Sequence, residues 1–468
     1  MKDFLAKLKN NGIVNDLRYF LSSKYFPFIT AAVTLLCYYL GWDIVLIYYI
    51  SITGALMVLF LDDLTPVISH LLFMSVAVSY KNSPSPIMES SDYFTRTEIL
   101  VQTVIMLSLF ALAAAYRITP TFVRKKFKFT PAFFGIAAFS FVLLLNGAGA
   151  KDYTAQNFVY GLILALCFMF IFVGLKDNIT TDKTCFEKLN LSFIALSVLL
   201  VIELTVKYFT VDGIIVNGEI VRTKLTFGWG MWNSMGMSLL LCIPSSVYLA
   251  AKSKYGFIYT LYSVLLLVAT FMSCSRQAML TVAVIYPACI LILLIKGKNK
   301  IANGCIVAAA LLAIIILCII FRDTVVKYFV EFIKKLFAGG DNSGNGRGRL
   351  WREALNYFIS YPYLGAGFHV KYSSPDFNGL SFIPLMCHNT VLEIMAACGV
   401  LGLITYAVHR CQTVVSFLKN VTMERTFLVL TVAGLLITSL FDNHIFYIFP
   451  TMIYSALFAV FTKSENKN

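Results

Sequence analysis

The chain has 468 residues, of which 59% are hydrophobic and only 13% are charged. Soluble domains average roughly 45–50% apolar and about 25% charged residues, and so few charges cannot cover the surface of a soluble protein of this length. The composition therefore excludes a water-soluble globule and predicts an integral membrane protein. The net charge of +14 would suggest a nucleic-acid partner in a soluble protein, but in a membrane protein it reports orientation. No nucleic-acid partner is expected.

Fourteen apolar stretches follow one another along the chain, most of them near the length of about 17–22 residues that crosses roughly 30 Å of hydrocarbon as a helix. They lie at 26–42, 44–61, 64–80, 98–116, 130–148, 156–175, 189–209, 233–251, 256–274, 277–295, 303–321, 388–408, 427–441 and 445–462. The third contains Pro66 and His70, and the last two form a tight pair. The pattern predicts an all-α polytopic membrane protein with about 14 transmembrane helices.

The distribution of Lys and Arg predicts the orientation in the membrane. With the N-terminus in the cytoplasm, the cytoplasmic segments hold 23 of the 38 basic residues and the short outer segments hold 6. Cytoplasmic loops are the ones enriched in Lys and Arg, so both termini are expected in the cytoplasm. Eight further basic residues lie in the outer segment 322–387, and Lys207 lies within a span.

Five segments are predicted on this basis. Residues 1–25 form a basic amphipathic segment on the cytoplasmic surface, 26–321 hold eleven spans, 322–387 form a large outer loop, 388–462 hold three spans, and 463–468 form a cytoplasmic tail. Within the outer loop, 322–337 and 350–362 have the apolar spacing of amphipathic helices, separated by the glycine-rich stretch 339–349. The loop is therefore expected to cap the membrane domain.

Arginines at the outer surface are candidates for binding an anionic group. Arg276 lies between two apolar runs without an acidic neighbour in sequence, and a half-buried guanidinium near lipid normally faces a partner or an anion. Arg349, with Arg347 and Arg352, opens the second loop helix beside glycines, and guanidinium groups bind phosphate in a bidentate manner. The alternatives are snorkelling to the interface for Arg276 and an ordinary solvated basic face for the other three.

His388 and Asn389 begin the span after the loop, where an imidazole could orient or deprotonate a hydroxyl. The alternative is an interfacial packing or capping role. Asp442, Asn443 and His444 lie in an outer turn that could face the same cavity or could be only a polar turn. Asn233 lies in an outer segment rich in aromatic residues and glycine, and its alternative is a role in the interfacial aromatic belt and in packing.

No metal site is expected, because the histidines 369, 388 and 444 stand at no metal-ligand spacing. Cys274 and Cys387 lie near Arg276 and His388 on the same side of the membrane. A disulfide between them is considered, although nothing in the sequence brings the two together.

Four short segments in the C-terminal half together carry a resemblance to a known family. They are WNSMGMSLLLCIP with Asn233, SRQAML with Arg276, RLWREALNYFISYPYLGAGF with Arg349, and HNTVLEIMAACGVLG with His388 and Asn389. In this order, with the large outer loop between the last spans, they resemble the O-antigen ligase and O-antigen (capsular) polysaccharide polymerase family. The first half of the chain shows only generic spans, and fourteen exceeds the dozen typical of the ligases.

The resemblance implies a membrane glycosyltransferase of the bacterial cytoplasmic membrane that acts at the outer face, inverts the anomeric centre and uses no metal or other cofactor. It implies that Arg276 and Arg349 hold the leaving pyrophosphate and that His388 orients or deprotonates the attacking sugar hydroxyl. Positive charges fixed in a low-dielectric site would stabilise the charge that develops on the leaving oxygen. The implied partners are an undecaprenyl-pyrophosphate-linked glycan as donor and acceptor, the lipid bilayer and a chain-length regulator.

Several readings stay open. A polymerase would transfer the growing glycan to another lipid-linked repeat unit, whereas a ligase would transfer it to the lipid A core with the same site residues. A flippase for lipid-linked oligosaccharides is the competing class, but transporters usually show internal repeats and a midplane site. A metal-dependent transferase would rest on Asp43 alone. The clustering of candidates at one face favours an enzyme.

Overall fold

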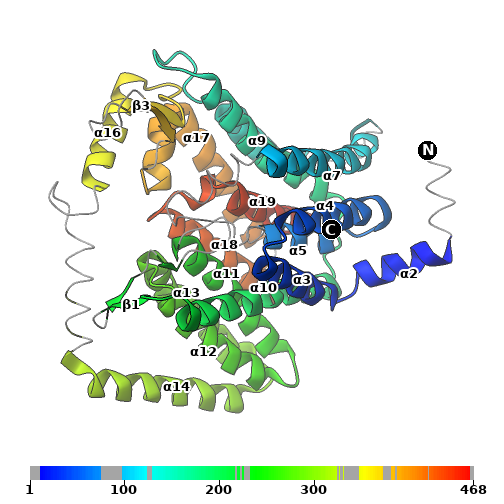
Figure 1. Ribbon diagram of the computed structural model, residues 1–468, viewed down its shortest axis with the longest axis vertical. Coiled ribbons are helices and arrows are strands. Elements are labelled where there is room, and N and C mark those ends of the chain that lie inside the picture. Colours follow the sequence, from blue (N-terminus) through cyan, green and yellow to red (C-terminus); the bar gives the residue numbers. More distant parts are fainter. Residues whose placement is uncertain are drawn as a thin grey trace.

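The computed structural model describes residues 11–74, 97–123, 129–216, 219–221, 224–225, 232–323, 326, 330, 347–372, 381–384, 387–419 and 421–463. These residues are mostly helical (Figure 1). The helices of the N-terminal half are α2 (Gly12–Leu21), α3 (Phe26–Leu40), α4 (Asp43–Phe60), α5 (Thr65–Met74), α7 (Thr97–Val123), α8 (Pro131–Leu144), α9 (Ala155–Lys176) and α10 (Lys183–Thr210). Those of the C-terminal half are α11 (Trp232–Lys252), α12 (Gly256–Met272), α13 (Arg276–Lys296), α14 (Lys300–Ile320), α16 (Arg347–Ser360), α17 (Thr390–Leu418), α18 (Met423–Ser439), the short 3₁₀ helix η3 (His444–Phe446) and α19 (Ile448–Lys463).

The all-α polytopic membrane architecture expected from the composition is confirmed, and every predicted span overlaps one of these helices. Seven helices of the described chain are long and apolar enough to cross a membrane, or up to eight if α2 and α3, which meet at 78°, form one broken span. Five further apolar stretches of helix, one of them within α7, have only 10–17 residues. The figure of fourteen spans is not confirmed, because these shorter stretches fall below the length of a full crossing.

The described chain also contains two small β-hairpins, which the all-α prediction did not include. Strands β1 (Ile215–Val216) and β2 (Glu219–Ile220) pair in antiparallel fashion. Strands β3 (His369–Tyr372) and β4 (Ser381–Pro384) do the same, with His369 opposite Pro384. Both hairpins lie between helices, in segments where the sequence shows no apolar run of spanning length.

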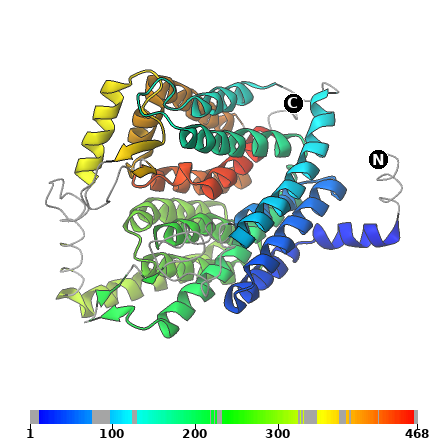
Figure 2. The same cartoon turned by 45° about the horizontal axis from the view of Figure 1, so that its top comes forward.

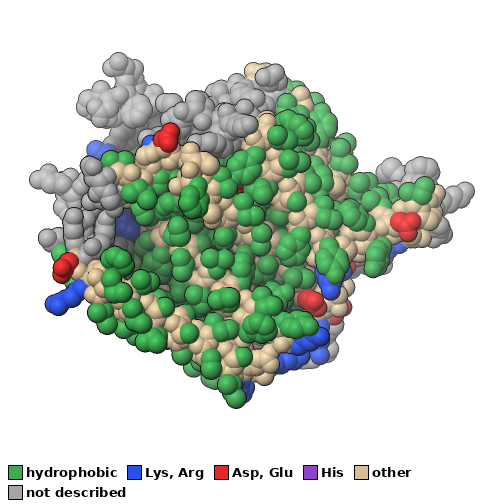
Figure 3. All heavy atoms as spheres, turned by 60° about the horizontal axis from the view of Figure 1, so that its bottom comes forward, with side chains coloured by type: hydrophobic (Ala, Val, Ile, Leu, Met, Phe, Trp, Pro, Cys, Tyr) green, Lys and Arg blue, Asp and Glu red, His purple; other side chains and the backbone are tan. Residues whose placement is uncertain are grey.

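The molecule has two distinct ends. In Figure 1, α16, β1 and β3 lie at the left and α2 lies at the right, and α16 and α2 keep these places in the view of Figure 2. We call them the α16 end and the α2 end. In Figure 3, hydrophobic side chains cover the broad middle of one face, and most of the charged side chains in view lie near its margins. Helix α14 contributes strongly exposed apolar residues, with Ile301 85% and Ile319 69% exposed. A surface of this kind is suited to lipid contact.

The predicted N-terminal surface segment contains a short amphipathic helix. Asn11 caps α2 by accepting a hydrogen bond from the backbone N–H of Ile13, and Arg18 forms an ion pair with Asp62 after α4. Residues 1–10 lie outside the described part of the chain, as does most of the predicted helix 322–337. The predicted loop helix 350–362 is present as α16.

Helix α17 is broken at Gly399, and the loop after α16 fills the break. Gly399 has φ 64°, a left-handed conformation that glycine adopts without steric cost. The backbone N–H groups of Val400 and Leu401 donate to the carbonyls of Pro362 and Tyr363 at 2.8 and 3.3 Å. Main-chain groups freed by a broken helix at membrane depth need such partners.

The same loop donates back to the first half of α17. The N–H of Ala366 bonds to the carbonyl of Ala396 at 2.7 Å, and the N–H of Gly367 bonds to that of Ala397 at 3.1 Å. A Cβ atom on Gly365, which has φ 71°, would lie 2.3 Å from the carbonyl carbon of Ala397. The glycines of this loop and of α17 therefore permit direct backbone-to-backbone packing.

Two asparagines anchor the other side of this loop. The Oδ1 atom of Asn146 accepts from the N–H of Phe368 at 3.1 Å. Asn157 accepts from the N–H of His369 at 2.6 Å and donates to its carbonyl at 3.0 Å. The loop is thus held between α17 and the connection from α8 to α9, and α16 is fixed to the membrane domain.

We expect Gly365→Ala to disrupt this packing far more than Gly149→Ala. Both glycines have positive φ, but a Cβ on Gly149 would meet nothing within 4 Å. Left-handed strain alone costs about 1–2 kcal/mol, and at Gly365 a backbone clash is added. Thermal unfolding of the purified variants in detergent measures the difference, and equal melting temperatures for the two variants would contradict the proposed packing.

Candidate active site

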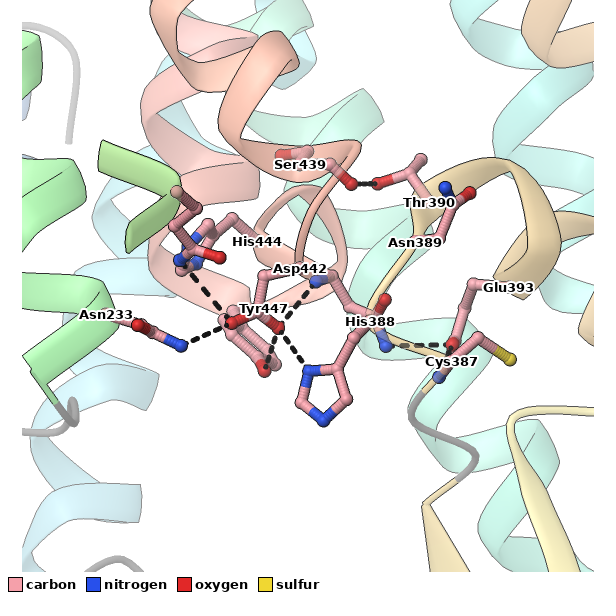
Figure 4. Close-up of polar contacts among 12 residues, drawn as sticks. Asn233, Cys387, His388, Asn389, Thr390, Glu393, Ser439, Asp442, His444 and Tyr447 are labelled. Carbon is pink, nitrogen blue, oxygen red and sulfur yellow. Dashed lines mark hydrogen bonds and ion pairs between the residues drawn. The ribbon is translucent and has the colours of Figure 1, made fainter. Parts of the chain in front are cut away.

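His388 and Asp442 form the centre of a polar cluster at the α16 end (Figure 4). The Nδ1 atom of His388 lies 3.0 Å from Oδ1 of Asp442, and their side chains are 30% and 4% exposed. His388 precedes α17, and Asp442 lies between α18 and η3. With Nδ1 turned to the carboxylate, the opposite ring nitrogen Nε2 points away from Asp442 (Figure 4). This arrangement fixes the orientation of the imidazole and leaves Nε2 on the side away from the carboxylate.

Four further donors surround the Asp442 carboxylate. Its Oδ1 accepts from the N–H of Asn443 at 2.8 Å and from the hydroxyl of Tyr447 at 3.4 Å. Its Oδ2 accepts from Asn233 Nδ2 at 3.0 Å and lies 3.5 Å from Gln277 Nε2. Burial by itself would raise the pKa of Asp442, but the hydrogen bond from His388 and the two nearby imidazoles hold that pKa well below its ordinary value. The carboxylate is therefore ionised at neutral pH.

The backbone around His388 is held from several sides. His388 has φ 49°, which is uncommon for a residue other than glycine and occurs often at functional sites. Asn389 caps α17 by accepting from the N–H groups of Val391 and Leu392, and it donates to the carbonyl of Leu440 at 3.0 Å. The predicted residue Asn389 therefore docks the start of α17 against the end of α18.

Glu393 accepts hydrogen bonds from both of the chain segments that carry the His388–Asp442 pair. Its Oε2 accepts from the N–H of Cys387 and from Asn443 Nδ2, both at 2.8 Å. Cys387 precedes His388 and Asn443 follows Asp442, so one carboxylate links the two segments that carry the pair. Asn443 and Glu393 are each 2% exposed.

Arg276 is the first residue of α13 and lies between two residues that bond to the cluster. Ser275 Oγ lies 3.3 Å from Asn233 Oδ1. Gln277 Nε2 contacts Asp442 and lies 2.6 Å from His444 Nε2. Cys274, two residues before the helix as His388 is two residues before α17, also has a positive φ, 56°. The Arg276 backbone is thereby fixed beside Asn233 and Asp442.

His444 is fully buried and reaches Asp442 through Gln277. Burial lowers the pKa of its imidazole, and the nearby Asp442 opposes that shift in part. Among the described residues, His444 Nδ1, Gln277 Oε1 and Asn443 Oδ1 are buried atoms without a hydrogen-bond partner. Such atoms are rare in folded proteins, and these three belong to residues within the cluster.

The arginines of the loop helix lie on α16, which packs against α17. Trp351 Nε1 donates to the carbonyl of Cys387 at 2.9 Å and so joins α16 to the residue before His388. Arg349 Nε lies 3.6 Å from Glu353 Oε1, with side chains 62% and 31% exposed. Arg347 is half-buried and Arg352 is exposed.

Most of the residues singled out in the sequence thus meet in space. The structure joins His388, Asn389, Asn233, Asp442 and His444, with Arg276 beside them, and places the α16 arginines on a neighbouring helix. It adds Gln277, Glu393 and Tyr447, which the sequence analysis missed. A polar residue inside an apolar span was the available signal for Glu393, and adjacency to Arg276 was the signal for Gln277.

From the sequence, a disulfide between Cys274 and Cys387 was considered and no metal site was expected. Cys274 and Cys387 are thiols and do not form the disulfide that was considered. Burial raises the pKa of the Cys387 thiol, and the neighbouring Glu393 carboxylate adds to that shift, so this thiol is protonated at neutral pH. Within the described ranges, no three His, Cys, Asp or Glu side chains are grouped so as to hold a metal ion.

Asp442→Asn is expected to destabilise the protein by about 2 kcal/mol or more at pH 7, because an amide N–H would face donors that now meet a carboxylate. The pKa of Asp442 is depressed in the folded state, so its stabilising effect is fully present above about pH 4 and is lost as the pH falls further. The difference in melting temperature from wild type should therefore shrink below about pH 4. Asp323→Asn, at an exposed position, serves as control. A difference that stays constant down to pH 2.5 would contradict this role.

Comparison with known proteins finds a match over part of the chain, and this part contains His388 but not its partner Asp442. Residues 261–407 match the family model described as O-antigen ligase. The matched region includes Arg276, Arg349 and His388 and runs from α12 into the second half of α17. No curated protein matches the chain significantly. Through residues 261–407, the chain is similar to the O-antigen ligase/polymerase family.

Proposed function

We propose that the protein is a polysaccharide polymerase, which transfers a growing glycan from undecaprenyl pyrophosphate to the end of another lipid-linked repeat unit. The observation that carries this proposal is the His388–Asp442 pair, at 3.0 Å, at one end of a membrane domain that is similar in part to the O-antigen ligase family. The match over residues 261–407 and the many apolar helices support an integral protein of a bacterial inner membrane that acts as a membrane glycosyltransferase. Lipid-linked glycans and the bilayer are then its expected partners, and a chain-length regulator stays a prediction.

The orientation that suits this function has the α16 end at the outer face. The excess of Lys and Arg in the segments of the α2 end supports it. Both termini would then be cytoplasmic. The amphipathic α2, which meets α3 at 78°, would lie along the cytoplasmic surface.

In the proposed reaction, the acceptor hydroxyl attacks the anomeric carbon of the donor and its proton passes to His388 Nε2. The anomeric C–O bond to the pyrophosphate breaks, and its electron pair leaves on the pyrophosphate oxygen. Inversion at the anomeric carbon follows from a single displacement. Asp442 stabilises the imidazolium that forms, because its carboxylate is ionised and faces Nδ1.

Arg276 and Arg349 would stabilise the departing pyrophosphate, with Arg347 and Arg352 adding positive charge nearby. A guanidinium matches the geometry of a phosphate and stays charged. Arg276 stands at the N-terminus of α13, where the helix dipole also favours an anion. Asn233, held by both Asp442 and Ser275, would orient this side of the site.

Arg276→Ala should reduce the rate of glycan transfer by about 100- to 1000-fold, the range for loss of one preorganised group that stabilises transition-state charge, while the protein still inserts in the membrane. Arg276→Lys should retain part of the activity, because it keeps the charge without the bidentate geometry. Arg322→Ala, at an exposed position after α14, is the control. Glycan length on gels, together with the amount of membrane-bound protein, measures the effect. Long polymer made by Arg276→Ala would overturn the assignment.

The family model is described as O-antigen ligase, and this observation favours the ligase as the second candidate. Both reactions use the same site and differ in the acceptor. Deletion of the gene distinguishes them by the glycans that remain. Loss of long polymer with single repeat units retained supports the polymerase, whereas accumulation of lipid-linked long polymer overturns it in favour of the ligase.

A further inference from the structure

A polar cavity lies at the α2 end of the molecule, away from the candidate active site. It has a volume of about 520 Å³ and is lined by the first turns of α3, α10, α12 and α18 and by the last turns of α11. Along α11, Asn233 of the candidate active site and Lys252 of this cavity are nineteen residues apart, which corresponds to about 28 Å of helix. That length is close to the roughly 30 Å of the hydrocarbon core, so the cavity lies at the opposite membrane surface.

The charged side chains of the cavity carry a small excess of positive charge. Lys24, Lys183 and Lys252 line it, together with Glu187 and Glu424. Lys252 Nζ lies 2.7 Å from Glu424 Oε1, so this pair is neutral as a unit. Lys24 and Lys183 then face Glu187 alone, which leaves an excess of positive charge. The N-terminal turns of four helices add partial positive charge to the same wall.

Aromatic and aliphatic side chains form the rest of the wall. Tyr25, Tyr248 and Tyr259 supply hydroxyl groups, while Phe28 and Leu191 supply apolar surface. Tyr25 and Phe28 are 65% and 37% exposed, so they lie at the mouth of the cavity. Tyrosine is enriched at the membrane–water interface, where one part of the ring meets lipid and the hydroxyl meets polar groups. The cavity therefore suits a ligand with a charged head and apolar chains.

We propose that this cavity binds the phosphate headgroup of an anionic glycerophospholipid in the leaflet opposite the active site. Lys24 and Lys183 contact the phosphate, the tyrosine hydroxyls donate to its oxygens, and the acyl chains lie along the apolar residues at the mouth. Basic pockets between transmembrane helices on the cytoplasmic side bind anionic headgroups, and that leaflet is the one rich in anionic lipid. The site is separate from the glycosyl-transfer site and does not depend on the reaction performed there.

Phosphatidylglycerol and phosphatidylcholine distinguish this site from general lipid contact. The full-length protein is purified in detergent, and lipid binding is followed by native mass spectrometry and by the melting temperature. Phosphatidylglycerol should be retained and should raise the melting temperature more than phosphatidylcholine does. Inorganic phosphate at the same concentration should give no shift. Equal effects of the two lipids would overturn the proposal, and a shift with phosphate alone would overturn the assignment to a lipid.

Neutralising the two lysines tests the residues. Lys24→Gln/Lys183→Gln should weaken phosphatidylglycerol binding by about 30-fold, since each lysine near an anionic lipid surface contributes roughly fivefold. Lys254→Gln/Lys300→Gln removes the same charge from exposed positions at the same end, outside the cavity, and should bind like wild type. Both variants should melt like wild type in phosphatidylcholine, which controls for folding. The preference for phosphatidylglycerol surviving in the first variant, or falling equally in both, would overturn the proposal.

Discussion

The α16 end of this protein depends on backbone hydrogen bonds that satisfy the broken turn of a membrane helix. Helix α17 opens at Gly399, and the segment from Pro362 to Gly367 provides both donors and acceptors for the opened turn. An unpaired backbone group costs several kcal/mol in a low-dielectric environment, so the loop and the helix stabilise each other's conformation. This single contact holds α16 against the membrane domain and fixes the first half of α17, on which His388 depends.

Asp442 has a corresponding role for the polar side chains. A buried carboxylate is stable only when donors offset its desolvation, and here those donors come from α11, α13, the segment before α17 and the residues that follow Asp442. The same contacts that keep the carboxylate ionised fix the orientation of His388. The hydrogen bonds to Asp442 therefore both stabilise the cluster and hold His388 in the orientation that the proposed proton transfer needs. Glu393 reinforces it by linking Cys387 to Asn443.

The two ends of the membrane domain carry different polar chemistry. At the α16 end, an ionised carboxylate faces an imidazole, Arg276 is next in sequence to two residues that bond to the cluster, and further arginines lie on the neighbouring α16. This arrangement supports the proposed transfer of a glycan from a pyrophosphate. At the α2 end, lysines and tyrosines line a cavity with an apolar mouth, as contact with an anionic lipid requires. Helices α10, α11, α12 and α18 reach both ends, so they form a common frame for the two sites.

Hydropathy, the counts of basic residues and short motifs predicted the membrane class and the approximate position of each helix along the chain. They also indicated Arg276, Arg349 and His388 as candidate site residues. All of these features depend only on the order of residues along the chain. They also suggested Asp442 and His444, but left a polar turn as the alternative. The break at Gly399 within an otherwise continuous apolar span was beyond them, since its cause is a loop more than thirty residues earlier. Three findings required the folded chain. They are the pairing of His388 with Asp442 across 54 residues, the presence of Cys274 and Cys387 as separate thiols, and the contacts of Gln277 and Glu393. These contacts depend on burial and on the geometry of donors and acceptors, and both arise only when distant helices pack.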